Sequence, residues 1–72
     1  MTDTELLEKA IERSGIKVAK LMEIAGIKSY STFKGRMNND TEFTASEIQS
    51  LSGALQLTAK ERDSIFFAGN VE

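Results

Sequence analysis

The residues of this chain with the most evident chemistry are gathered in one stretch near its middle, GIKSYSTFKGRMNND, residues 26–40. The stretch contains three cationic side chains, a run of hydroxyl side chains and one tyrosine, and its only acid is its last residue. Side chains of these types donate hydrogen bonds to phosphate oxygens and to the edges of bases. The composition of the stretch therefore favours binding to a nucleic acid, or to acids on a protein partner.

Catalytic and metal chemistry are disfavoured by what the whole chain lacks. Its 72 residues include no histidine and no cysteine, which removes imidazole-dependent mechanisms, disulfides and thiolate zinc sites. The sequence has no glycine-rich phosphate loop and no cluster of carboxylates at a predicted pocket, so no nucleophile is paired with a base. We expect a protein that is not an enzyme and that has no metal, no cofactor and no small-molecule substrate.

Positive charge is concentrated in the middle of the chain. The segment 13–39 has a formal charge of +5, whereas residues 1–12 sum to −3 and residues 40–72 to −4, which gives the net charge of −2. A basic segment between acidic ones suits a small protein that approaches a polyanion with one face. The same cations also fit a solvated helix face. The acidic ends would complement a basic protein partner through Glu5, Glu8, Glu12, Glu42 and Glu47.

Capping signals divide the chain into helices. Three tetrapeptides match the capping box, in which a hydroxyl and a glutamate three residues later satisfy helix N–H groups reciprocally: Thr2-Asp3-Thr4-Glu5, Thr44-Ala45-Ser46-Glu47 and Thr58-Ala59-Lys60-Glu61. Apolar spacing and the closing residues Gly15, Gly26 and Gly69 predict helices over about 3–14, 17–25, 29–38, 45–55 and 59–68. Strand patterns are nearly absent. We therefore expect an all-α fold, a compact five-helix bundle formed by one domain, residues 1–72.

The connection between the second and third predicted helices is short. Gly26 ends one helix and Ser29 is the N-cap of the next, with Ile27 apolar enough to fill the angle between them. This arrangement predicts a helix-turn-helix over about residues 17–38. In DNA-binding proteins that use it, the second helix places its N-terminal end in the major groove.

Apolar residues at helical spacing predict the core. Its expected members are Val18, Leu21, Phe33, Met37, Ile48, Leu51 and Leu55. The adjacent residues Phe66 and Phe67 fit either a wide final core contact or an exposed binding patch. We leave both interpretations open, because a helix buries one of two neighbouring residues more easily than both.

The segment VAKLMEIAGIKSYSTFKGRMNN, followed by TEFTASEIQSLSGALQLT, resembles the Cro/CI-type helix-turn-helix of temperate-phage regulators. The resemblance covers about residues 5–67. In length and pattern the chain is also similar to small Cro-like phage proteins that include the "modulator of repression" antirepressors. The resemblance implies a lambda-repressor-like DNA-binding domain in a transcription regulator of the lysis–lysogeny switch.

The resemblance also implies roles for individual residues. Those at or near the base edges would be Lys28, Ser29, Tyr30, Ser31 and Lys34. Those nearer the phosphates would be Lys17, Thr32, Arg36 and Asn39. Lys20 completes the predicted DNA- or partner-binding set. The hydroxyls of this set also fit a purely capping role, and Tyr30 also fits packing against the bundle.

Two functions follow from these observations. In the first, a Cro-like regulator binds double-stranded operator DNA, and a symmetric homodimer would place two recognition helices about 34 Å apart. In the alternative, an antirepressor binds the phage CI-type repressor protein and blocks its DNA-binding surface, with little DNA binding of its own. No apolar run reaches the roughly 18 residues of a membrane span, and the N-terminus is acidic, unlike a secretory signal. We expect a protein of the bacterial host cytoplasm with no membrane partner.

Overall fold

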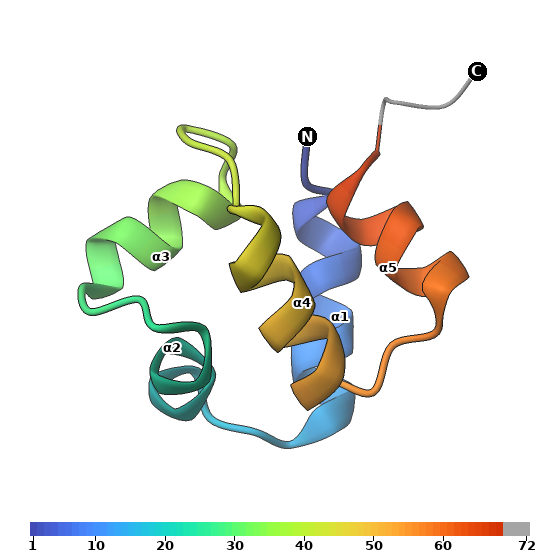
Figure 1. The fold of residues 1–72 in the computed structure, drawn as a ribbon, viewed down its shortest axis with the longest axis horizontal. Helices are drawn as coiled ribbons and strands as arrows, with labels where there is room; N and C mark the ends of the chain where they lie inside the picture. The colour runs from blue at the N-terminus through green and yellow to red at the C-terminus, as the bar shows by residue number, and fades with distance from the viewer. Residues whose placement is uncertain (69–72) are drawn as a thin grey trace.

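The computed structural model describes residues 1–68, and within that range it contains five α-helices and no strand (Figure 1). The helices are α1 (Thr4–Ser14), α2 (Val18–Ala25), α3 (Tyr30–Met37), α4 (Ala45–Ala54) and α5 (Ala59–Phe66). Helix α4 packs mainly against α2, and α1 packs against α5. In Figure 1, α2 and α3 lie on one side of the molecule and α5 on the other. The predicted all-α, five-helix fold is confirmed.

Two of the three predicted capping boxes are present. Thr44 Oγ1 accepts a hydrogen bond from the backbone N–H of Glu47, whose carboxylate accepts one from the N–H of Thr44. Thr58 and Glu61 make the same reciprocal pair at the start of α5. Each pair satisfies backbone N–H groups that have no partner inside the helix. The predicted starts of α4 and α5 follow from this local chemistry.

The predicted capping box of the first helix is wrong. Asp3, and not Thr2, is the N-cap of α1, and its carboxylate accepts a hydrogen bond from the N–H of Leu6 at 3.1 Å. Thr2 is buried. Its backbone N–H donates to Asn39 Oδ1 at 2.7 Å, and its carbonyl accepts from Asn39 Nδ2 at 2.9 Å. The tertiary contact of Thr2 therefore leaves the capping position to the next residue.

The N-terminal segment connects the end of α3 to α5. The N–H of Asp3 donates to the carbonyl of Ile65 at 2.7 Å, and the hydroxyl of Thr4 donates to the carbonyl of Met37. Together with the Thr2–Asn39 pair, these bonds hold three segments that are distant in the sequence. The carboxyl end of α3 is fixed on the bundle as a result.

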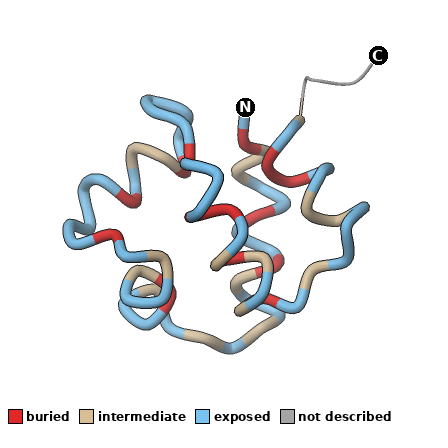
Figure 2. Tube along the Cα trace, in the orientation of Figure 1, coloured by how far each residue is buried: buried red, intermediate tan, exposed pale blue. Residues whose placement is uncertain are grey.

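The core lies where the five helices converge. Its buried apolar members are Leu7, Ala10, Leu21, Ile27, Phe33, Met37, Phe43, Ile48, Leu51, Leu55, Ile65 and Phe66. Phe43 packs edge-on against both Phe33 and Phe66, with ring centroids 6.1 Å and 5.4 Å apart, a preferred aromatic geometry. In Figure 2 each of the five helices carries buried positions, drawn in red.

Two details of the core and the helix ends differ from the sequence prediction, and one decides between the two interpretations of Phe66 and Phe67. Val18 was expected in the core and is only partly buried, at its edge. Phe66 is buried and Phe67 is 39% exposed, so the two phenylalanines do not share one role. Helix α5 ends at Phe66, two residues before the predicted end, and Gly69, predicted to close it, lies outside the described residues.

None of the helices in residues 1–68 has the length and apolar character that a membrane span requires.

Candidate functional site

The connection from α2 to α3 sets the position of the candidate site. Gly26 has a φ of +76°, a left-handed conformation that glycine adopts without steric cost, and its N–H donates to the last turn of α2. Ile27 is 6% exposed and anchors the connection in the core. Figure 1 shows α2 almost end-on and α3 lying across the view, so the two axes cross steeply. The first turn of α3 consequently lies at the periphery of the molecule.

The first turn of α3 presents polar side chains to solvent. Tyr30 is 58% exposed, and its neighbours Ser31 and Thr32 are also exposed, as is Lys34 in the last turn of the helix. Phe33, between them in sequence, is 1% exposed and holds the helix on the core. Phe33 and Met37 supply the buried face of α3, and the four polar residues lie outside that face. Here the structure brings together four of the ten predicted site residues.

Ser29 has a capping role that the sequence also allowed. Its Oγ accepts a hydrogen bond from the N–H of Thr32 at 3.3 Å and lies 2.9 Å from the Oγ of Ser31. A ligand that bonded Ser29 would compete with the cap, whereas Ser31 retains hydrogen-bonding capacity on its exposed side. Of the two serines, Ser31 is the better placed for recognition.

The five cations of the predicted set fall into two groups. Lys17, Lys28 and Lys34 are exposed, and the salt bridges within residues 1–68 involve other cations. Lys20 instead pairs with Glu23 at 3.2 Å on the surface of α2. Because both side chains of that pair are highly exposed, the pair is weak and a phosphate could displace it. Three lysines are therefore immediately available to an anionic ligand.

Arg36 is engaged inside the protein. Its Nε donates to Glu47 Oε1 at 2.7 Å, and its Nη1 donates to Thr41 Oγ1 at 3.0 Å. The Arg36 and Glu47 side chains are 19% and 10% exposed. Glu47 also caps α4, so the pair joins α3 to the start of α4. A phosphate would have to compete with a largely buried ion pair for the Arg36 guanidinium, which the sequence pattern did not indicate.

Asn39 is similarly committed. Its backbone has a φ of +68°, a conformation in which asparagine is enriched, and its side-chain amide bonds both polar groups of the Thr2 backbone. The contact of Asn39 with a phosphate stays a prediction. Such a contact would require these two hydrogen bonds to break. Arg36 and Asn39 thus lie at the far end of α3, where they have structural partners.

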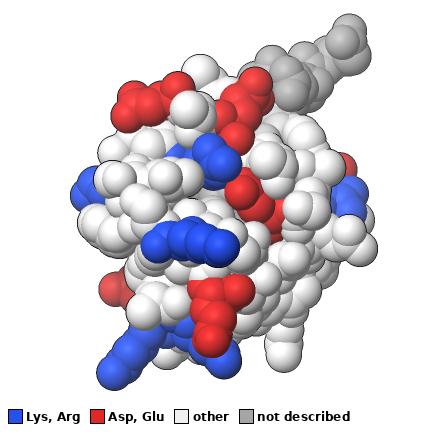
Figure 3. Space-filling view, turned by 60° about the vertical axis from the view of Figure 1, so that its left-hand side comes forward, with Lys and Arg blue, Asp and Glu red and all other residues white. Residues whose placement is uncertain are grey.

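Positive charge does not form a continuous surface over α2 and α3. In Figure 3, which turns this side of the molecule forward, blue lysine and arginine atoms are separated by red carboxylate atoms. Glu23 accompanies Lys20 on α2, and the side chain of Glu47 faces Arg36. The +5 charge of the sequence segment already includes Glu23, and it is partly neutralised in three dimensions by acids from other segments, Glu47 at Arg36 and Glu61 at Arg13.

An apolar groove adjoins the exposed Tyr30 ring. It is lined by Val18, Ala19, Met22, Glu23, Gly26, Ile27, Lys28 and Tyr30. The partly buried Val18 and Met22 form its floor from the outer side of α2. The sequence pattern assigned Val18 to the core because helical spacing does not distinguish a fully covered position from one at the core's edge.

A second groove, between α1 and α3, places carboxylates beside the candidate site. Glu8 and Glu12 line its α1 side, and Lys34 and Tyr30 line its α3 side. The proximity of α1 to the recognition surface was not deducible from local pattern. These acids favour a cationic group on whatever ligand approaches α3 from this side.

No group of three or more potential metal-ligating side chains lies together among the described residues. No family model, curated protein or solved structure matches this chain.

Proposed function

We propose that this chain is a regulator of a phage lysis–lysogeny switch that binds double-stranded operator DNA through a helix-turn-helix formed by α2 and α3. The observation that carries the proposal is the exposed polar face of α3, formed by Tyr30, Ser31 and Thr32 in its first turn and by Lys34 in its last turn. The N-terminal residues of a recognition helix are the ones that reach base edges in this binding mode. The phage assignment rests on the sequence resemblance to Cro/CI-type regulators.

The polar residues would make two kinds of contact with DNA, to bases and to phosphates. Lys34 has the reach and charge to donate to guanine O6 and N7, while Ser31 would give a weaker and less selective base contact. Lys17 and Lys28, at the two ends of α2, are suited to phosphates on either side of the groove. With three free lysines per protomer, the slope of log K against log salt would be about −2.7, and about −5.4 for a symmetric dimer.

A second candidate, the antirepressor, is favoured by the two grooves. The apolar groove of Val18 and Met22 and the carboxylates of Glu8 and Glu12 border the same exposed Tyr30. Apolar and acidic surface suits a basic protein better than it suits phosphates. The DNA-reading surface of a CI-type repressor would be such a partner, and its coverage would release the operator.

One titration separates the two candidates. The chain is added to labelled DNA from the regulatory region around its own gene, with and without the cognate repressor, at two salt concentrations. The DNA-binding proposal predicts a shifted band for the chain alone, with the salt slope given above. No shift up to about 10 μM, well beyond specific affinities, would reject it. Loss of repressor–DNA complex without any chain–DNA complex would establish the antirepressor instead.

A further inference from the structure

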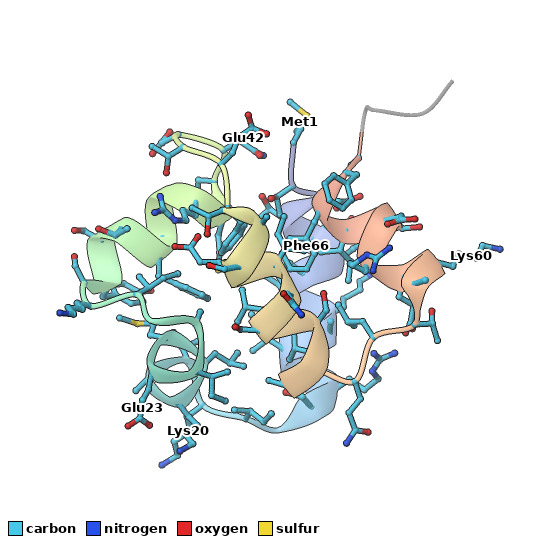
Figure 4. All side chains as sticks on the ribbon, viewed as in Figure 1. Met1, Lys20, Glu23, Glu42, Lys60 and Phe66 are labelled. Carbon is cyan, nitrogen blue, oxygen red and sulfur yellow. The ribbon has the colours of Figure 1, made fainter. Side chains whose placement is uncertain are left out.

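A second surface with binding character lies between α1 and α5, away from α2 and α3. The groove is lined by Leu6, Lys9, Ala10, Arg13, Lys60, Glu61, Ser64 and Ile65. In Figure 4 Lys60 projects from the α5 side, opposite the labelled Lys20 and Glu23 of α2. A ligand in this groove would leave the first turn of α3 open.

The floor of the groove is apolar and its rims are cationic. Ala10 and Ile65 form the floor, and Leu6 is left 37% exposed beside them. Lys9 stands on the α1 rim and Lys60 on the α5 rim, both exposed, and neither takes part in the salt bridges found within residues 1–68. Apolar surface between two cationic rims matches a partner with an apolar stripe flanked by acids.

Glu61, the one acid among the described residues that line the groove, does not cancel this charge. Glu61 Oε2 lies 3.2 Å from Arg13 Nη1, and this pair bridges α1 and α5 at one end of the groove. Since Arg13 and Glu61 neutralise one another, Lys9 and Lys60 leave a local charge of +2 on a chain whose net charge is −2. The stripe from Leu6 to Arg13 spans about 10 Å, two turns of a docked helix.

We propose that the groove between α1 and α5 is a docking site for an acidic amphipathic helix of a protein partner. A second copy of this chain fits less well, because two-fold pairing through the groove would bring the Lys9 and Lys60 rims of both copies together. Duplex DNA fits less well because the floor offers it no polar group. The site is independent of whether α3 reads DNA or a repressor, so the chain would act as an adaptor with two faces.

The test uses two synthetic 15-residue helical peptides with the same leucine stripe, one flanked by glutamates and the other by lysines. Each is titrated into the full-length ¹⁵N-labelled chain while amide shifts are followed. The acidic peptide is expected to bind saturably and to shift amides near Leu6, Lys9, Arg13, Lys60 and Ser64. The basic peptide is expected to leave those amides unchanged.

Charge-reversal variants identify the rims. In Lys9→Glu/Lys60→Glu, two attractive contacts become repulsive, and affinity for the acidic peptide is expected to fall about tenfold. Arg62→Glu also reverses a cation on α5, but Arg62 does not line the groove, so this variant is expected to alter that affinity less than twofold. Circular dichroism confirms that both variants are folded.

Several outcomes would overturn the proposal. These are no saturable binding by 1 mM acidic peptide, an order-of-magnitude ceiling for a specific site; equal binding of both peptides; shifts centred on α3; or a loss of affinity in Arg62→Glu as large as that in Lys9→Glu/Lys60→Glu. Sedimentation showing a dimer whose interface is this groove, or a duplex-DNA footprint on the same amides, would assign the groove to another occupant.

Discussion

The ion pair between Arg36 and Glu47 predicts that Arg36→Ala destabilises the fold far more than the loss of an ordinary surface cation. The Nε–Oε1 distance is 2.7 Å, and the two side chains are 19% and 10% exposed. Removing one member of a buried pair costs about 3–5 kcal/mol, because the other charge is left without compensation. Glu47 keeps its bond from the N–H of Thr44, so we expect a loss of about 2–3 kcal/mol.

The matched control is Lys20→Ala, which also removes one cation from the basic segment. Lys20 and Glu23 are 63% and 72% exposed at 3.2 Å, so the expected loss is below about 0.5 kcal/mol. Urea denaturation followed by circular dichroism measures both free energies of unfolding. In thermal scans, Arg36→Ala should lower Tm by about 10–20 °C. A loss for Arg36→Ala within about 0.5 kcal/mol of the control would refute the assignment of Arg36 to the fold.

Three further predictions test the fold around the site. Gly35→Ala should raise the free energy of unfolding by about 0.5–1 kcal/mol in urea denaturation, because alanine has the higher helix propensity and its Cβ would make ordinary van der Waals contacts with Asp40 at 3.8 Å and Thr41 at 4.0 Å; a loss would contradict this. Phe33→Ala should cost about 3–5 kcal/mol and leave little folded protein by circular dichroism, whereas a native Tm would be inconsistent with the burial of Phe33. The pKa of Glu61 is held below its ordinary 4.5 by the hydrogen bond from the Thr58 backbone and by Arg13. Ionised Glu61 therefore adds to the free energy of unfolding above pH 4.5, and this stabilisation is lost as the pH falls through the lowered pKa. Wild type and Glu61→Gln should therefore converge in urea midpoint at acidic pH, and a constant difference would argue against this contribution.

Local chemistry explains the parts of the fold that the sequence predicted well. Thr44 and Thr58 bond glutamates three residues later, and Gly26 and Ser29 act within one turn of their helices. Each capping or helix-ending residue and its hydrogen-bond partner lie in the same short segment. The sequence therefore predicts the positions and approximate bounds of the helices. The first helix shows the limit, since Thr2 and Asp3 are both good caps and a contact 37 residues away decides between them.

The candidate site was predictable in outline only. The exposed first turn of α3 follows from a buried Phe33 between polar neighbours, which is a local pattern. The partners of Arg36 and Asn39 come from α4 and from the N-terminus. Such pairings depend on how the helices pack against one another. The types and spacing of residues along the sequence do not show which distant residue will be the hydrogen-bond partner.

The central claim is that the exposed face of α3 formed by Tyr30, Ser31, Thr32 and Lys34 is the recognition surface. It is tested most directly by comparing wild type, Lys34→Ala and Arg62→Ala in fluorescence-anisotropy titrations against regulatory-region DNA and against the cognate repressor. Arg62 lies on α5, and among residues 1–68 its salt-bridge partner is the exposed Asp63. Its removal therefore matches the charge change of Lys34→Ala away from α3. We predict that Lys34→Ala weakens binding at least about fivefold to whichever ligand wild type binds, while Arg62→Ala stays within twofold. Equal affinities of the two variants for both ligands would contradict the claim.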